Sequence, residues 1–395
     1  MKILVVCQYY WPEPFRISDL CEALVERGHQ VTVVTGTPNY PEGNIYPGYE
    51  GAQHRDEIVR GVRVIRCPIH PRKRGALHRF WNYYSFVFAS KRCLSGLKEE
   101  FDVVFVNQLS PVMMAESALQ WARKHGKKCV LYCLDLWPES LKAGGIRSGS
   151  LVYRIFLNIS RNIYRKADFI FMTSQGFAQY FQSVLGIEQK KLSYLPQYAE
   201  EQFQTLPENL DKDHRFHVLF AGNIGEVQSV ETLVEAARRL SDTPEIHVDI
   251  VGDGITLEKC RQMAAGLTNI TFHGRKDLSE MPYYYAKADV MAVTLKADPV
   301  LSLTLPGKVQ SYLAAGKPVV GAINGETAEV IAAADCGLCG PAEDAVALAE
   351  NIFAMSQNTG QLARWGENGR RYYYSHFSKS VFLENLEQKL EDFCR

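Results

Sequence analysis

The sequence predicts an α/β protein made of two doubly wound domains that face a central cleft. Short apolar runs without alternation, typical of strands covered on both faces, alternate with amphipathic helical patterns along the chain. This pattern lapses into polar sequence once, before His214, and then resumes. At 395 residues, the chain also exceeds one ordinary hydrophobic core.

The first half opens with a strand, a helix and a second strand, which form a βαβ unit. The loop after the first strand lies at the carboxyl edge of the sheet, where open α/β folds bind ligands. Arg16, at the start of the helix, is therefore a candidate anion contact, with an ordinary surface arginine as the alternative. One parallel sheet is expected, with strands at 2–7, 30–35, 62–66, 102–106, 128–133 and 168–173.

The second half repeats this pattern. Glycine turns after its first two strands, Gly222–Gly225 and Gly252–Gly254, allow backbone N–H groups to approach a phosphate. Ser229 is expected to cap the helix that follows the first turn. Strands are expected at 216–221, 246–251, 270–273, 289–293 and 319–322, and three amphipathic helical runs from Ala342 end the chain.

The segment from Thr304 to Val320 predicts a helix that leads into a buried strand. Pro306 is expected in the first turn, Gly316 can take a left-handed cap, and Pro318 prevents continuation. Lys308 in the first turn and Ser311 at i+3 can face the same side. A helix N-terminus with a lysine is suited to bind an anion, although any αβ unit of a parallel sheet has similar features.

Composition and motifs exclude several functional classes. The formal net charge is zero, and no nucleic-acid-binding module is recognisable, so no nucleic-acid partner is expected. The ten cysteines are scattered, with one isolated CxxC, and are expected to be buried thiols in a reducing cytoplasm without a metal site. Neither glycine turn fits the dinucleotide fingerprint, and the Walker, nucleophile-elbow and zinc-protease motifs are missing. No apolar run reaches the length of a membrane span, and the apolar start is too short for a signal peptide.

Two further segments carry candidate functional residues. Asp135 and Glu139 follow a buried strand directly, so a carboxylate there can orient an attacking hydroxyl; the alternative is a helix cap. Residues 71–98 contain seven Lys or Arg and no acidic residue, interleaved with aromatics. This pattern fits a helix lying on an anionic membrane, or an amphipathic core helix with a solvated basic face.

These residues resemble glycosyltransferase family four, whose members are retaining enzymes with the GT-B fold that use nucleotide sugars. The resemblance covers nearly the whole chain and is most similar to the WbuB-like branch, named for an N-acetylfucosaminyltransferase of O-antigen synthesis. The motifs that carry it are Tyr10–Glu13, Pro38–Gly43, Asp135–Ser140, Ala221–Gly225 with Gln228, and Leu305–Lys308 through Gly316–Val319.

The resemblance implies two Rossmann-like domains, expected at 1–205 for the acceptor and 206–375 for the donor. Residues 376–395 are expected to form a helix that returns toward the first domain. The implied reaction transfers a sugar with retention from a nucleotide donor, expected to be UDP-linked, to a lipid-linked glycan acceptor. UDP-N-acetylfucosamine or a related amino sugar is a candidate donor, O-antigen or capsule a candidate product. The implied location is the cytoplasmic face of the cell membrane, with residues 71–98 as the peripheral contact.

The sequence also departs from the family pattern. Leu303 and Ser311 occupy the places of the family's Glu-x7-Glu pair, and Asn223 and Gln228 replace the basic pair that holds the diphosphate. A front-side mechanism, in which the departing phosphate helps to deprotonate the acceptor, needs no carboxylate nucleophile and no metal. The candidate catalytic residues are Asp135, Glu139 and Lys308. The candidate donor-binding residues are Glu13, Arg16, Gly222, Asn223, Gly225, Gln228, Gly252, Arg275, Lys308, Gln310 and Ser311.

Two alternatives remain open from the sequence. A sugar-nucleotide 2-epimerase can share the two-domain fold and would need no lipid acceptor. A non-catalytic scaffold of a glycan-assembly complex would explain the missing glutamates.

Overall fold

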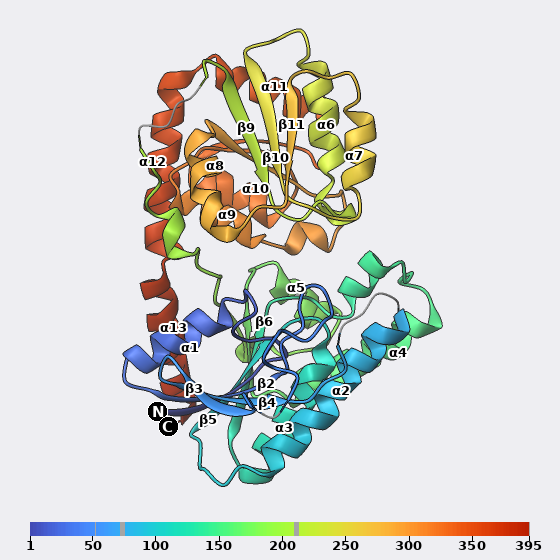
Figure 1. Cartoon of the computed structure of the whole chain (residues 1–395), viewed down its shortest axis with the longest axis vertical. Coiled ribbons are helices and arrows are strands. Elements are labelled where there is room, and N and C mark those ends of the chain that lie inside the picture. Colours follow the sequence, from blue (N-terminus) through green and yellow to red (C-terminus); the bar gives the residue numbers. More distant parts are fainter. Residues whose placement is uncertain (52, 72–75, 209–212, 395) are drawn as a thin grey trace. The chain divides into compact units, whose positions relative to one another are not determined.

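The computed structural model describes residues 1–51, 53–71, 76–208 and 213–394, which form two compact units. The first unit contains residues 1–173, 177–195 and 385–395, and the second contains 174–176 and 196–384 (Figure 1). Residues 196–205, expected in the first domain, therefore belong to the second unit.

The first unit is built on an eight-stranded sheet with the order β3-β4-β2-β1-β5-β6-β7-β8. All neighbouring strands are parallel except β3 and β4, so the expected parallel sheet has one antiparallel edge strand. The central strands β1 and β5 are buried except at Lys2, which explains their largely apolar sequence. The strands are β1 (Lys2–Val6), β2 (Gln30–Gly36), β3 (Asp56–Val59), β4 (Val62–Cys67), β5 (Val103–Gln108), β6 (Lys128–Cys133), β7 (Phe169–Met172) and β8 (Leu192–Tyr194).

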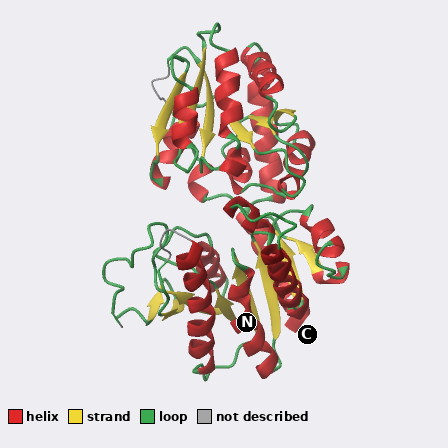
Figure 2. Ribbon diagram, turned by 90° about the vertical axis from the view of Figure 1, so that its right-hand side faces the viewer, coloured by secondary structure: helices red, strands yellow, loops and turns green. Residues whose placement is uncertain are grey.

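Helices cover both faces of this sheet (Figure 2). They are α1 (Ile17–Glu26), α2 (Ala76–Ser95), α3 (Glu116–His125), α4 (Leu151–Lys166) and α5 (Phe177–Ser183). Helix α13 (Lys379–Cys394) contributes its last residues, where Phe393 packs on Phe169. None of the helices in the described part of the chain has both the length and the apolar character needed to span a membrane.

The second unit has a six-stranded parallel sheet with the order β11-β10-β9-β12-β13-β14. Its strands are β9 (Phe216–Ala221), β10 (Ile246–Val251), β11 (Ile270–Gly274), β12 (Val290–Thr294), β13 (Val319–Ala322) and β14 (Gly337–Gly340). Its helices are α6 (Val230–Arg239), α7 (Leu257–Met263), α8 (Met281–Lys287), α9 (Gly307–Ala314), α10 (Glu326–Ala333), α11 (Ala345–Ser356) and α12 (Thr359–His376). Alternate residues of β9 and β10, such as Val218 and Ile250, pack on α6 and α7 in the core.

Three local expectations need correction. The sequence did not predict β3, β8 or β14, which are short edge or near-edge strands. Ser229 does not cap α6 with its side chain; it has left-handed backbone angles, and its hydroxyl lies 3.0 Å from that of Thr232. Pro306 is the N-cap of α9 and precedes its first turn. In the isolated CxxC, Cys336 directly precedes β14 and Cys339 lies on it, and both thiols are free.

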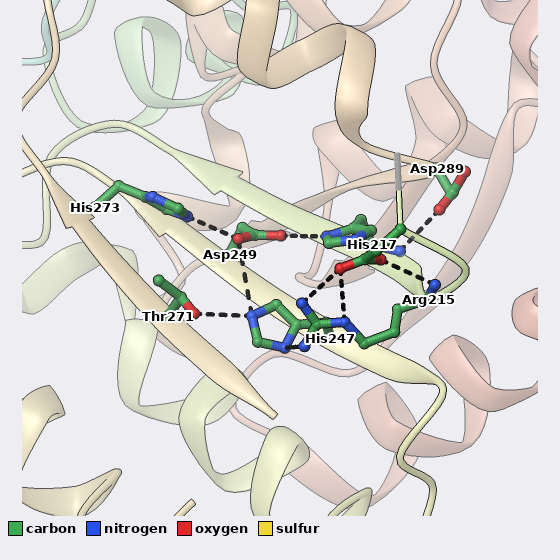
Figure 3. Close-up of polar contacts among 8 residues, drawn as sticks. Arg215, His217, His247, Asp249, Thr271, His273 and Asp289 are labelled. Atoms are coloured by element: carbon green, nitrogen blue, oxygen red, sulfur yellow. Dashed lines mark hydrogen bonds and ion pairs between the residues drawn. The ribbon is translucent and has the colours of Figure 1, made fainter. Parts of the chain in front are cut away.

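On the face of β9, β10 and β11 opposite the core, titratable side chains form a hydrogen-bonded cluster (Figure 3). His217 lies between two carboxylates: its Nδ1 is 2.6 Å from Asp249 Oδ2 and its Nε2 is 2.8 Å from Asp213 Oδ1. Asp249 also accepts from His273 Nε2 at 2.7 Å. The hydrogen bond to Asp249, supported by Asp213, raises the pKa of His217 above its ordinary value.

This cluster predicts that the second unit loses stability as the pH rises. A histidine with a raised pKa in the folded state contributes stability that is complete below its unfolded pKa of about 6.5 and is lost as the pH rises through the folded pKa. We therefore expect the free energy of unfolding in urea to fall between neutral and mildly alkaline pH. The variant His217→Gln should lose most of this pH dependence, and equal slopes for both proteins would contradict the prediction.

Candidate active site

Helix α9 is anchored firmly in the second unit. Its residue Tyr312 is fully buried, and the hydroxyl oxygen lies 3.4 Å from the carbonyl oxygens of Ala221 and Ala292. Gly316 follows the helix with a φ of 66°, which is the left-handed cap that the sequence predicts. The start of the helix therefore has a fixed position beside the carboxyl ends of β9 and β12.

The side chain of Lys308 turns back from the first turn of α9 onto the end of β9. Its Nζ lies 3.8 Å from the centroid of the Phe220 ring. A Cβ atom placed on Gly222 would lie 2.8 Å from the same nitrogen, so the amine approaches the backbone of the glycine turn closely. Within the described residues this buried amine has no hydrogen-bond partner, and burial lowers its pKa to about 7. An unpaired buried amine is costly, and an anion at this position would provide the missing partner.

The glycine turns lie beside one another at the same sheet edge. Gly222 N–H donates to Val251, and Gly252 N–H donates to Gly274, each at 2.9 Å. Gly252 has a φ of 151°, and a Cβ atom there would lie only 1.8 Å from the carbonyl oxygen of Gly222. These glycines are therefore required by close backbone approach. Arg275 follows directly after β11 and is exposed.

Asn223 and Gln228 lie at the same turn as Lys308. Asn223 Nδ2 donates to Gln228 Oε1 at 3.2 Å, and both side chains crowd the position where Gly225 would carry a Cβ atom. Neither side chain is charged. Lys308, reaching over from α9, therefore provides the positive charge beside this turn.

Gln310 and Ser311 are directed to contacts within the second unit. Gln310 is buried. With the side-chain amide in the orientation that satisfies the hydrogen bonding of both its oxygen and its nitrogen, the nitrogen donates to the carbonyl oxygens of Pro306 and Gly307. The Ser311 hydroxyl is 3.4 Å from Glu200 Oε2 and from Gly307 O. Both side chains thus stabilise the start of α9 and its surroundings.

Glu326 is a residue that the sequence did not single out. Its two carboxylate oxygens accept from the backbone N–H groups of Gln175 and Gly176 at 2.7 and 2.6 Å. Beside them, Leu305 N–H donates to Ser174 Oγ at 2.7 Å. The contact holds the segment that leads into α9. In the sequence, Glu326 is recognisable just as an acidic residue in the first turn of a helix after Gly325. Its role was not predictable, because its partners lie about 150 residues away in the sequence.

In the first unit, Asp135 lies after β6 in a partly buried position. It accepts hydrogen bonds from the side chains of Ser110 and Ser140, and burial raises its pKa to about 6. A carboxylate with this pKa is suited to accept a proton near neutral pH.

Glu139 has a different environment. Its Oε1 accepts from the hydroxyl groups of Tyr153 and Tyr180, the latter at 2.6 Å, and its Oε2 pairs with Lys142 at 2.5 Å. The buried carboxylate is thereby engaged by the chain itself, which favours a structural role.

Glu13 and Arg16 belong to the loop after β1. The buried carboxylate of Glu13 accepts from the backbone N–H groups of Tyr10, Asn39 and Tyr40 at 3.2, 2.8 and 2.7 Å. Burial raises its pKa to about 7, although these bonds oppose the shift. Glu13 therefore organises two loops. Burial raises the pKa of the Tyr132 hydroxyl, and the charge of Arg16, at the N-cap of α1, partly offsets this rise.

Comparisons with known proteins agree with this architecture. A model described as a glycosyl transferase 4-like domain matches residues 15–197, and one described as glycosyl transferases group 1 matches residues 215–358. Both models describe glycosyltransferase domains, so the chain is a glycosyltransferase. The break between the two matched segments falls where the polar sequence interrupts the α/β pattern.

Individual relatives of this glycosyltransferase are distant. An Escherichia coli (strain K12) protein named as a colanic acid biosynthesis glycosyl transferase, WcaI, is 28% identical to this chain over 337 residues. These residues cover 80% of this chain and 82% of the relative. A structure of Anabaena HepE in complex with UDP has a TM-score of 0.71 at 15% identity, covering 99% of this chain and 100% of that one. WaaG, a glycosyltransferase involved in lipopolysaccharide biosynthesis, has a TM-score of 0.66 at 17% identity, covering 100% and 99%. At such identities the structural likeness establishes the GT-B fold.

The described residues contain no group of three or more His, Cys, Asp or Glu arranged to hold a metal ion. The expected assignment to the WbuB-like branch stays a prediction, because the relative named above is WcaI.

Proposed function

We propose that this glycosyltransferase transfers a sugar from a nucleoside diphosphate donor, with UDP as the nucleotide, to a glycan acceptor of surface polysaccharide synthesis. The observation that carries the donor assignment is the unpaired, buried amine of Lys308 beside the glycine turn of β9. The names of WcaI and WaaG support the polysaccharide pathway, and the UDP complex of HepE supports the nucleotide.

In the proposed complex, the diphosphate lies against Lys308, the first turn of α9 and the backbone N–H groups of the glycine turns. The charge, the helix dipole and the N–H groups all favour a negatively charged group. They would also stabilise the charge that develops on the departing diphosphate. We place Arg275 near the base and Arg16 as a second anion contact, whereas Glu13, Gln310 and Ser311 support the fold.

We further propose retention at the anomeric carbon by a front-side mechanism that needs no metal ion. Neither Leu303 nor Ser311 can act as a carboxylate nucleophile, so the acceptor hydroxyl attacks on the side from which the diphosphate departs. A phosphate oxygen then accepts the acceptor proton. Asp135 orients the acceptor, because burial raises its pKa to about 6 and its carboxylate accepts from the hydroxyls of Ser110 and Ser140.

The acceptor is proposed to be lipid-linked, which places the enzyme peripherally on the inner face of the cell membrane. The basic segment at residues 71–98 is the proposed contact; Arg72, Lys73 and Arg74 of this segment lie outside the described residues. UDP-N-acetylfucosamine or a related amino sugar remains the first donor to test.

The donor proposal is tested by a thermal-shift screen of nucleotides and nucleotide sugars. A ligand that binds only the folded state raises the melting temperature by mass action. We expect UDP and a UDP-sugar to raise it more than the corresponding monophosphate, because the diphosphate fills the Lys308 site. Absence of any shift, confirmed by calorimetry, would favour a scaffold. Conversion of a sugar nucleotide without an acceptor would favour an epimerase.

A further inference from the structure

Helix α4 of the first unit begins with a turn whose apolar side chains face solvent. Leu151, Val152 and Ile155 have exposed fractions of 74, 48 and 50%. The opposite side of the helix is buried through residues such as Tyr153 and Ile163. Leu151 and Ile155 are one turn apart, so they form an exposed apolar stripe on a helix whose opposite side is buried.

Only basic charges accompany this stripe. Residues 141–167 contain no Asp or Glu, and Arg147 and Arg154 are exposed beside the first turn. Within the described residues neither arginine forms an ion pair. At the far end of α4, Lys166 pairs with Glu116. Two cations without an ion pair among the described residues, Arg147 and Arg154, thus lie beside the exposed apolar side chains.

Helix α2 has a similar exposed face. Trp81 and Phe88 are two turns apart and have exposed fractions of 54 and 69%, and Lys91 and Arg92 are exposed after them. Both α2 and α4 pack against the short helix η1 (Val112–Ala115), so they are neighbours on one side of the first sheet. Exposed aromatic, aliphatic and cationic side chains therefore lie on adjacent helices.

We propose that the exposed faces of α2 and α4 form one docking surface for an anionic lipid bilayer, into which the first turn of α4 inserts Leu151 and Ile155. The inference deepens the proposed function, because it rests on a lipid-linked acceptor and adds a second helix to the membrane contact. Cations favour anionic headgroups, aromatic rings lie at the headgroup level, and aliphatic side chains enter the acyl boundary.

The charges also argue against a second copy of the chain as the occupant. A symmetric dimer would place this surface against itself, and its unpaired cations would then repel one another. A lipid surface of opposite charge has no such conflict.

The test is sedimentation with neutral phosphatidylcholine vesicles and with vesicles that also contain an anionic lipid. The wild-type chain should pellet with the anionic vesicles, less so at high salt. The variant Leu151→Gln/Ile155→Gln should bind them at least about tenfold more weakly, because two aliphatic side chains are lost from the lipid. Its control is Ile255→Gln/Val346→Gln, which changes two exposed aliphatics of the second unit and should bind like the wild type.

Equal binding by the stripe variant and the wild type would overturn the proposal. So would equal binding to neutral and anionic vesicles, or a concentration-dependent dimer that the stripe variant alone loses. UDP-induced thermal stabilisation is measured on the same samples. It should be unchanged in the stripe variant, so failure of membrane docking is distinguishable from failure of the donor site.

Discussion

Replacement of Lys308 by methionine should weaken UDP binding by about 10- to 100-fold. The substitution keeps most of the apolar stem but removes the amine that lies beside the glycine turn of β9. Hydrogen bonds to charged groups contribute about 1.5–3 kcal/mol, which corresponds to this range of dissociation constants. Because the amine has no hydrogen-bond partner among the described residues, its removal should leave the fold intact or stabilise it.

Isothermal titration calorimetry measures this effect directly. Lys259→Met is the matched control, since Lys259 is an exposed lysine of the same unit, paired with Glu231. It should bind UDP like the wild type. Unchanged UDP affinity in Lys308→Met would remove Lys308 from the donor site.

The same lysine should make UDP binding dependent on pH. Burial lowers the pKa of Lys308 to about 7, so the free protein holds a growing fraction of neutral amine as the pH rises above 7. A bound diphosphate favours the charged amine, and binding must then take up a proton. The phosphate groups of free UDP contribute little to this change, because the second ionisation of a phosphate has a pKa of about 6 and is mostly complete at pH 7.

We therefore expect UDP affinity to fall between pH 7 and 9, and the binding heat to depend on the ionisation enthalpy of the buffer. In Lys308→Met both effects should disappear. A flat affinity profile in the wild type would mean that the amine is already charged.

Replacement of Gly252 by alanine should strongly destabilise the second unit. The residue has a φ of 151°, and the new Cβ atom would overlap the carbonyl oxygen of Gly222 at 1.8 Å. Backbone strain of about 1–3 kcal/mol and overpacking of a similar size give an expected loss of about 2–6 kcal/mol. Total stabilities of about 5–15 kcal/mol make this loss severe. The glycine turn should also lose its UDP contact.

Urea unfolding measures the loss, with Gly266→Ala as the control. Gly266 also has a positive φ, of 84°, but no atom lies within 4 Å of its added Cβ atom, so only strain of about 1–2 kcal/mol is expected. Equal destabilisation by the two substitutions would mean that the overlap at Gly252 is relieved by movement of the turn.

The regular part of the fold follows from the sequence. Strands β6, β9, β10 and β13 have the bounds that the sequence predicts. For β6 and β13 the reason is that strands buried on both faces need continuous apolar sequence. The end of α9 was also predictable, since only glycine takes the cap at position 316 without strain. Strands β3 and β14 escaped prediction because edge positions do not require this composition.

Some of the candidate donor residues were likewise predictable from the sequence, and the roles of others depend on tertiary contacts. Lys308 was recognisable as a lysine at a helix start. The turns at Gly222 and Gly252 were recognisable as glycine turns whose backbone N–H groups can approach a phosphate. The role of Glu13 was not recognisable, because the N–H groups that its carboxylate binds include those of a second loop. Ser311 similarly has a partner, Glu200, that is 111 residues away.

The sequence by itself therefore determined the two α/β domains, the glycine turns and the helix that carries Lys308, because these depend on local periodicity and on residues with special backbone freedom. Only the tertiary structure decided that the Lys308 amine lies over Phe220 without a hydrogen-bond partner among the described residues. It also decided that Glu139 accepts from Tyr153 and Tyr180 and that Glu326 holds the segment before α9. Burial and hydrogen bonds between distant segments set the charge and availability of a side chain, and these leave no local pattern in the sequence.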